Sequence, residues 1–359
     1  MSPVTTSTLT PTPAAAALPL AQPATPPPAA QPAAPPAAGP AGTRAARLDR
    51  WRVPFSVAAL CVLPFVLPSQ ALAVNVLIYG LFTVGFNLLF GYTGLLSFGH
   101  AAFFGGGAYL TGMAIAHFGL GWAPAMLIGV AGASLLALVI GALSIRTRGI
   151  YFCMVTLALA QLVYYVALQA SGWTGGENGL RGFTVAKAEV LGLFTVNLLD
   201  PLQKYYFLMV FAALALWFVS RVLNSPFGAA IEAVRENETR ARACGYDVER
   251  TKLLAFVLSG AVAGLAGTLS ALHLSIVPLD ALGYHTSSLA VVMTMLGGAG
   301  SFFGPFIGAL AFLLIEDVAS LWTSHWQLIV GIIFILFVLF LPKGLWGSVI
   351  GFVKKGRAP

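Results

Sequence analysis

The sequence predicts an all-α fold, a polytopic bundle of about 8–10 transmembrane helices in which some helices are broken or short. Two observations lead to this prediction: 58% of the 359 residues are hydrophobic while 9% are charged, and the apolar residues gather in long runs. A soluble domain is about 25% charged, so a water-soluble enzyme and a nucleic-acid-binding module are both excluded. The formal charge of +7 fits cationic cytoplasmic loops, and the expected surroundings are a lipid bilayer.

The first 43 residues differ in composition from the rest of the chain. Residues 1–43 contain no charged side chain and hold 12 of the 22 prolines, mixed with alanine, threonine and glutamine. Such a stretch cannot bury a core and favours extended conformers, so we expect a disordered tail. It has no basic region or continuous apolar core, so it is not expected to be a signal peptide. Residues 44–359 are expected to form one transmembrane domain.

Long apolar segments with short breaks follow the tail, and each crossing of a membrane needs about 20 helical residues. One segment, Ser287–Ile315, is interrupted by glycines and is interpreted as a broken helical pair. The bundle then has eight full spans plus this pair, or ten short spans. The other candidates are Val53–Pro68, Ala71–Phe90, Ala101–Phe118, Trp122–Ile145, Ile150–Ser171, Tyr205–Val222, Leu253–Ile276 and Gln327–Pro342.

The charges of the loops predict the orientation of the chain. Cytoplasmic loops are enriched in lysine and arginine, and four arginines precede the first span, so both termini are expected in the cytoplasm. The loop 221–252 falls on the same side, and the loop 172–204 falls outside. This parity requires an even number of crossings in Ser287–Ile315, which leaves Glu316 and Asp317 outside, at the end of a span.

Two glycine-rich stretches interrupt the apolar runs. The first is Gly91–His100, followed by Gly105–Gly107, and the second is Gly297–Ser301, followed by Gly304-Pro305. Irregular backbone at membrane depth is tolerated where it is buried in protein or lines a polar cavity. The alternative is that these glycines form turns and close helix contacts, and that the histidine caps a helix. The candidate residues of a translocation path are Gly94, Ser97, Gly99, His100, Gly297 and Gly298.

The loop 224–250 is rich in charges. Residues 221–252 hold 11 of the 31 charged side chains of the chain. Ser225-Pro226 is a strong helix start and Gly245 a good stop, so we expect a single amphipathic helix over Phe227–Arg242. Its predicted role is to dock on a soluble partner, and the alternative is a solvated loop helix. The residues predicted to make the docking contacts are Phe227, Ile231, Val234, Arg235 and Glu236.

The sequence lacks the motifs of ATP binding, of catalysis and of metal binding. The sequence contains no phosphate-binding loop of the Gly-x-x-x-x-Gly-Lys-Ser/Thr type, so any ATP hydrolysis must occur on another subunit. No paired carboxylates and no Ser–His or Cys–His arrangement suggest catalysis, so the chain is not expected to be an enzyme. The three cysteines fit neither disulfides nor a zinc site. No cofactor and no metal site are expected.

Five blocks of sequence together resemble one family, the branched-chain amino acid ABC permeases of the Liv type, and more closely its LivM-like members than its LivH-like members. The resemblance runs from about Arg52 to Gly347. The blocks are Gly91–Gly105, Arg148–Gln161, Thr174–Leu180, the loop segments Ser225–Gly228, Ala233–Glu238 and Cys244–Tyr246, and finally Leu296–Ser301 with Gly304-Pro305.

This resemblance implies the transmembrane fold of an ABC importer permease and a place in the bacterial inner membrane. It further implies a second, LivH-like permease subunit, two cytoplasmic ATPase subunits and an extracytoplasmic solute-binding protein that delivers branched-chain amino acids. The loop 224–250 would then carry the helix that contacts the ATPase.

The sequence departs from the family at Ser288-Leu289, where members often carry Gly-Glu, and in the proline- and alanine-rich tail. Urea, short amides and aromatic carboxylates therefore remain alternative substrates within the family. A stand-alone secondary transporter or channel is the alternative of another class, with Glu316 and Asp317 as its only candidate carboxylates.

Overall fold

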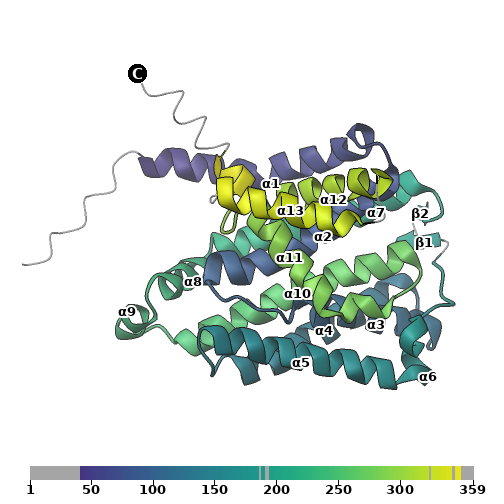
Figure 1. The fold of residues 1–359 in the computed structure, drawn as a ribbon, viewed down its shortest axis with the longest axis horizontal. Helices are drawn as coiled ribbons and strands as arrows, with labels where there is room; N and C mark the ends of the chain where they lie inside the picture. Colours follow the sequence, from purple (N-terminus) through teal and green to yellow (C-terminus); the bar gives the residue numbers. More distant parts are fainter. Residues whose placement is uncertain (1–40, 186, 191–193, 323–324, 342–343, 349–359) are drawn as a thin grey trace, which may run out of the picture. The chain divides into compact units, whose positions relative to one another are not determined.

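The computed structural model describes residues 41–185, 187–190, 194–322, 325–341 and 344–348 (Figure 1). Contacts divide the chain into residues 1–47 and 48–359, and the helical core lies in the second unit. The predicted disordered tail therefore lies outside the described residues, apart from residues 41–43, which are helical. The cationic C-terminal residues Lys354, Lys355 and Arg357 also lie outside them.

Helices make up most of the described chain, as the sequence predicts, and one short antiparallel hairpin is added to them. The hairpin pairs β1 (Lys187–Val190) with β2 (Phe194–Asn197). The longer helices are α1 (Ala41–Val66), α2 (Gln70–Asn87), α3 (His100–Ala116), α4 (Trp122–Ser144), α5 (Ile150–Gln169), α7 (Pro201–Leu223), α8 (Pro226–Glu236), α10 (Val248–Leu274), α11 (Tyr284–Gly297), α12 (Gly304–Trp322) and α13 (Trp326–Phe340). The shorter ones are η1 (Leu88–Thr93), α6 (Ser171–Thr174), η2 (Gly176–Asn178), α9 (Glu238–Ala243) and η3 (Leu279–Leu282).

Each predicted apolar segment coincides with a helix, and the broken pair corresponds to α11 and α12. Within the described residues, six helices are long and apolar enough to cross a membrane: α2 with η1, α4, α5, α7, α10 and α12. Shorter apolar stretches occur at Ser56–Val66 and Gln327–Phe337. The prediction of a polytopic helical bundle with short and broken helices is confirmed.

Helix α3 runs without a break through Gly105–Gly107, as the predicted segment Ala101–Phe118 requires, and these glycines make the close helix contacts of the alternative interpretation. One detail of the prediction is wrong. Helix α12 continues past Ile315 to Trp322, so Glu316 and Asp317 lie inside a helix and not at its end. Glu316 is half-buried there and Asp317 is exposed.

Helix α10 is central in the arrangement of the second unit, since it contacts α2, α3 and α4 (Figure 1). Helix α2 also contacts α7 and α12, and α12 contacts α11 and α13. Helices α8 and α9 lie at one end of these helices, and the hairpin and α6 lie at the other end (Figure 1). The charged loop and the loop 172–204 are thus on opposite sides.

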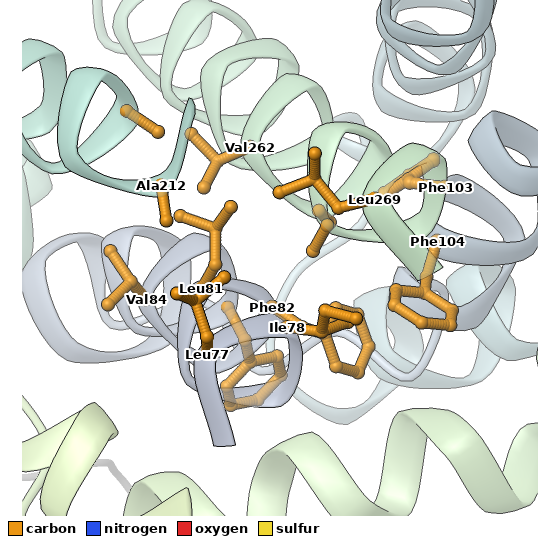
Figure 2. Packing of buried hydrophobic residues seen from close by; sticks show 14 of the residues in the cluster. Leu77, Ile78, Leu81, Phe82, Val84, Phe103, Phe104, Ala212, Val262 and Leu269 are labelled. Atoms are coloured by element: carbon orange, nitrogen blue, oxygen red, sulfur yellow. The ribbon is translucent and has the colours of Figure 1, made fainter. Parts of the chain in front are cut away.

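The core forms where α2, α3, α7 and α10 meet. Leu81 and Phe82 of α2 are fully buried, and the Phe82 ring lies 4.8 Å from the ring of Phe104 on α3. Figure 2 shows these side chains together with Ala212 of α7 and Leu269 of α10. Lipid tails are as apolar as these side chains, so within a bilayer the core is stabilised by close van der Waals packing between the helices.

Small residues allow α3 and α10 to approach each other closely. A Cβ placed on Gly267 of α10 would lie 1.8 Å from the carbonyl oxygen of Phe104, which is backbone and cannot turn aside. We therefore expect Gly267→Ala to lower the free energy of unfolding by about 1–3 kcal/mol or more, because the two helices must separate. Thermal unfolding of the purified protein measures this effect. Gly331→Ala on α13 is the matched control, because that Cβ would meet nothing within 4 Å. An unchanged melting temperature for Gly267→Ala would contradict the close packing.

Candidate functional site

The first interrupted helix is a π-helical ending followed by irregular backbone. Helix α2 passes into η1, which ends at Gly94 with the left-handed φ of +77° that glycine adopts without strain. Residues 94–99 are then irregular until α3 begins at His100. The hydroxyl of Ser97 accepts a hydrogen bond from the amide of Gly99 at 3.1 Å, just before the new helix.

The second interrupted helix is closed in the same way. Helix α11 ends at Gly297, and α12 begins at Gly304. The hydroxyl of Ser301 accepts from the amide of Gly304 at 3.1 Å and donates to the carbonyl of Gly298 at 2.8 Å. Both breaks therefore use a serine hydroxyl to accept the bond of a glycine amide at the start of the next helix.

Asn87, at the end of α2, joins the two breaks. Its side chain is 2% exposed. Its Nδ2 donates to the carbonyl of Ser301 at 3.0 Å, and its Oδ1 accepts from the amide of Gly300 at 2.9 Å. The close approach of η1 to the backbone at Gly300 also needs a glycine at position 91. A Cβ there would lie 2.1 Å from Asn87 Oδ1 and 2.5 Å from the Gly300 nitrogen. Segments more than 200 residues apart thus form one structure, which we call the Asn87 junction: Asn87, Gly91, Gly300 and Ser301.

The path candidates divide into one exposed and five buried residues. Ser97 and His100 have no exposed surface, and Gly99, Gly297 and Gly298 are also buried. Gly94 is exposed. The structure brings the two glycine-rich breaks together through Asn87, which is not among the predicted site residues.

His100 holds three helices together. Its Nε2 lies 2.7 Å from Ser259 Oγ of α10, and that hydroxyl donates to the carbonyl of Gly85 of α2 at 2.6 Å. The serine proton is used in that second bond, so the imidazole donates from Nε2. The rings of Phe86 and Phe103 lie 5.0 and 5.5 Å from the histidine ring, edge to face. His100 is thus enclosed by aromatic side chains.

The charged loop forms two helices where the sequence predicts one. Helix α8 begins at Pro226 and ends at Glu236, and α9 spans Glu238–Ala243. Between them Asn237 is extended, with φ −161° and ψ 106°, and its Oδ1 accepts from the amide of Arg240 at 2.9 Å. Asparagine favours such N-cap positions over helix interiors, and this preference breaks the predicted helix. The predicted start at Ser225-Pro226 is confirmed, and Gly245, with φ +89°, follows the end of α9.

The apolar side of α8 is covered by this chain itself. Ile231 has no exposed surface and Val234 is 1% exposed. Val234 packs with Ala241 and Val248, and α8 contacts η1, α7 and α10. The prediction that Ile231 and Val234 face a partner is therefore wrong, because the amphipathic pattern of α8 matches a surface within the chain. Phe227 is half-buried.

The charged side of α8 stays open to solvent, with Glu232, Arg235 and Glu236 exposed. Arg235 also lies against both breaks: a Cβ placed on Gly94 would be 3.3 Å from Arg235 Cγ, and one on Gly300 would be 3.4 Å from its Nη1. The loop is fastened to α10 by an ion pair between Glu238 and Lys252.

The Asn87 junction has one local signal in the sequence, although Asn87 is absent from the predicted site. Asn87 is an amide side chain within an apolar helix, four residues before Gly91. A polar group in such a position needs hydrogen-bond partners, and a glycine one turn later leaves room for another backbone. Its partners could not be named from the sequence, because they lie in a distant segment. Across the described residues no group of three histidine, cysteine, aspartate or glutamate side chains could hold a metal ion.

Comparison with known proteins points to transport. A family model described as the permease component of branched-chain amino acid transport systems matches residues 70–339. The chain is 30% identical over 77% of its length to the high-affinity branched-chain amino acid transport system permease protein LivM of Salmonella typhimurium, of which it covers 69%. It is 29% identical over 76% of its length to the Escherichia coli LivM protein, of which it covers 69%.

A more distant relative carries a different substrate in its name. The chain is 29% identical over 58% of its length to the ribose import permease protein RbsC of Escherichia coli, of which it covers 67%. No solved structure matches the chain.

Proposed function

The chain belongs to the family of branched-chain amino acid transport permeases and is LivM-like, and on this premise we propose that it is the membrane subunit of an ATP-driven importer. The proposed location of the chain is the bacterial inner membrane. Branched-chain amino acids are the proposed substrate, delivered by an extracytoplasmic solute-binding protein. A second, LivH-like permease and two cytoplasmic ATPase subunits complete the complex, and hydrolysis takes place on the ATPases.

The contact between the charged loop and the broken helices supports this proposal most strongly. An importer driven by an external ATPase needs a rigid cytoplasmic element in contact with the parts that open the path. Helix α8 rests on η1 and on α10, and its Arg235 lies against both breaks. Irregular backbone in a transporter marks the region where the path is built. We propose that Gly94, Ser97, Gly99, Gly297 and Gly298 move with these breaks when the path opens.

The exposed acids of α8 are the proposed ATPase contacts. Glu232 and Glu236 are four residues apart, so they lie on one face of the helix, and both are exposed. Charged groups at such a surface fix orientation and partner choice more than affinity. The apolar side that the sequence suggested for this role is buried within the chain, so the docking is assigned to the polar side.

The proposal fixes an orientation, with α8 and α9 in the cytoplasm and the loop 172–204 outside. Cys244 is an exposed native thiol beside α9, and Arg181 is an exposed residue of the loop 172–204. With Cys61 and Cys153 replaced by alanine, a membrane-impermeant maleimide should label Cys244 only after the membrane is opened. When Cys244 is also replaced and Arg181→Cys is introduced, the same reagent should label the chain on intact cells. The reverse pattern would contradict the orientation.

Uptake by cells tests the substrate. Deleting this subunit in its native host should reduce uptake of labelled leucine to background, and the native chain supplied in trans should restore it. Unlabelled isoleucine and valine should compete for the restored uptake, while ribose should not. Normal leucine uptake in the deletion strain, with loss of ribose uptake instead, would replace the proposed substrate with a sugar.

A further inference from the structure

Arg235 lies at the point where the cytoplasmic loop meets both broken helices. Its aliphatic part lies over Gly94, and its guanidinium lies beside Gly300, as the distances from a Cβ placed on each glycine show. Both glycines have φ of +77°, so both belong to the irregular segments and not to the helices. A single side chain of α8 therefore touches both breaks.

The chemistry of this position suits an arginine. Gly94 terminates η1, and Gly300 lies three residues beyond the end of α11. The C-terminal end of a helix carries a partial negative charge, which a cation stabilises when it lies near the last turn. The planar guanidinium remains charged and can serve two neighbouring acceptors, whereas a lysine supplies a single point charge.

Asn87 makes the two breaks respond together. Its amide bonds to the backbone of Gly300 and Ser301 from the last residue of α2. It is buried, so loss of these bonds would leave unpaired polar groups away from water, and the bonds are therefore costly to break. If Arg235 displaces Gly300, Asn87 and the loop that precedes α12 must therefore move with it, and Asn87 is the last residue of α2.

We infer that Arg235 is a positioning residue that transmits the movement of the ATPase to the two broken helices through the Asn87 junction, and that it is not a docking contact. This inference rests on the proposed function. Docking belongs to Glu232 and Glu236, which are exposed on the same helix, while Arg235 connects that helix to the membrane core.

The test separates binding of the ATPase from its coupling to transport. The complete complex carrying Arg235→Ala is purified and placed in proteoliposomes with the binding protein and labelled substrate. The ATPase should co-purify as with the native chain, and ATP should still be hydrolysed. Uptake per ATP hydrolysed should fall by about 5- to 150-fold, which is the change that corresponds to a typical coupling free energy. Arg240→Ala, which changes an exposed arginine of α9, should leave this ratio unchanged.

Two further variants sharpen the test. Arg235→Lys should restore only part of the uptake, because the ammonium cannot serve both breaks. Asn87→Ala should lower the same ratio if the chain folds, and its melting temperature reports on folding. A native uptake ratio in Arg235→Ala would overturn the inference, and so would loss of the ATPase from that complex, which would make Arg235 a docking contact. Failure of the native complex to contain an ATPase would instead refute the proposed function.

Discussion

Replacing Val234 with aspartate is expected to abolish folding of the cytoplasmic loop and to reduce the amount of intact protein in the membrane. The side chain is 1% exposed and packs with Ala241 and Val248. A carboxylate there would be buried without a partner, so the free energy of unfolding should fall by more than about 4 kcal/mol. The monodisperse peak in detergent and the melting temperature measure this loss.

A matched variant separates burial from charge. Ala229 is exposed on the same helix, so Ala229→Asp introduces the same carboxylate into water. This control should retain the native peak and melting temperature. If Val234→Asp kept the native peak and melting temperature, as expected of Ala229→Asp, but lost the ATPase, the apolar side of α8 would face the partner.

Reversing the charge of both Glu232 and Glu236 is expected to abolish ATPase association and uptake while the permease remains folded. Both side chains are exposed, so the melting temperature should change by little. The proposed docking by two carboxylates requires a complementary, positively charged ATPase surface. Two lysines in their place would be repelled by that surface, and such like-charge contacts cost several kcal/mol. Co-purification of the ATPase with Glu232→Lys/Glu236→Lys is the measurement.

Glu177→Lys serves as its control, because Glu177 is exposed in the loop 172–204, at the opposite end of the helices from α8. This variant should keep both ATPase and uptake. Retention of the ATPase by the double variant would contradict the assignment of docking to the charged side of α8.

Much of the fold follows from local sequence, because spans are recognised by length and apolar composition alone. The predicted segments Trp122–Ile145 and Ile150–Ser171 agree with α4 and α5 within two residues. Glycine was less informative. Gly297 ends a helix, whereas Gly105–Gly107 lie inside one, and the difference depends on a neighbouring backbone that the local sequence does not reveal.

In the charged loop, too, local features are predictable from the sequence and tertiary contacts are not. The start of α8 is local, since Ser225-Pro226 is sufficient to begin a helix. The burial of Val234 is tertiary, because an amphipathic pattern shows that one side is covered but not by which molecule. Asn87 illustrates the same limit: the need of its amide for partners was predictable, and their identity required the fold.

The energy source of transport distinguishes an ATP-driven importer from a secondary transporter. The complete complex is reconstituted in proteoliposomes with its ATPase sites accessible, and the binding protein with labelled leucine is supplied on the opposite side. We predict leucine uptake with ATP and none with a non-hydrolysable analogue, irrespective of any proton or sodium gradient. Uptake that follows such a gradient without ATP would contradict the account and would make the chain a secondary transporter.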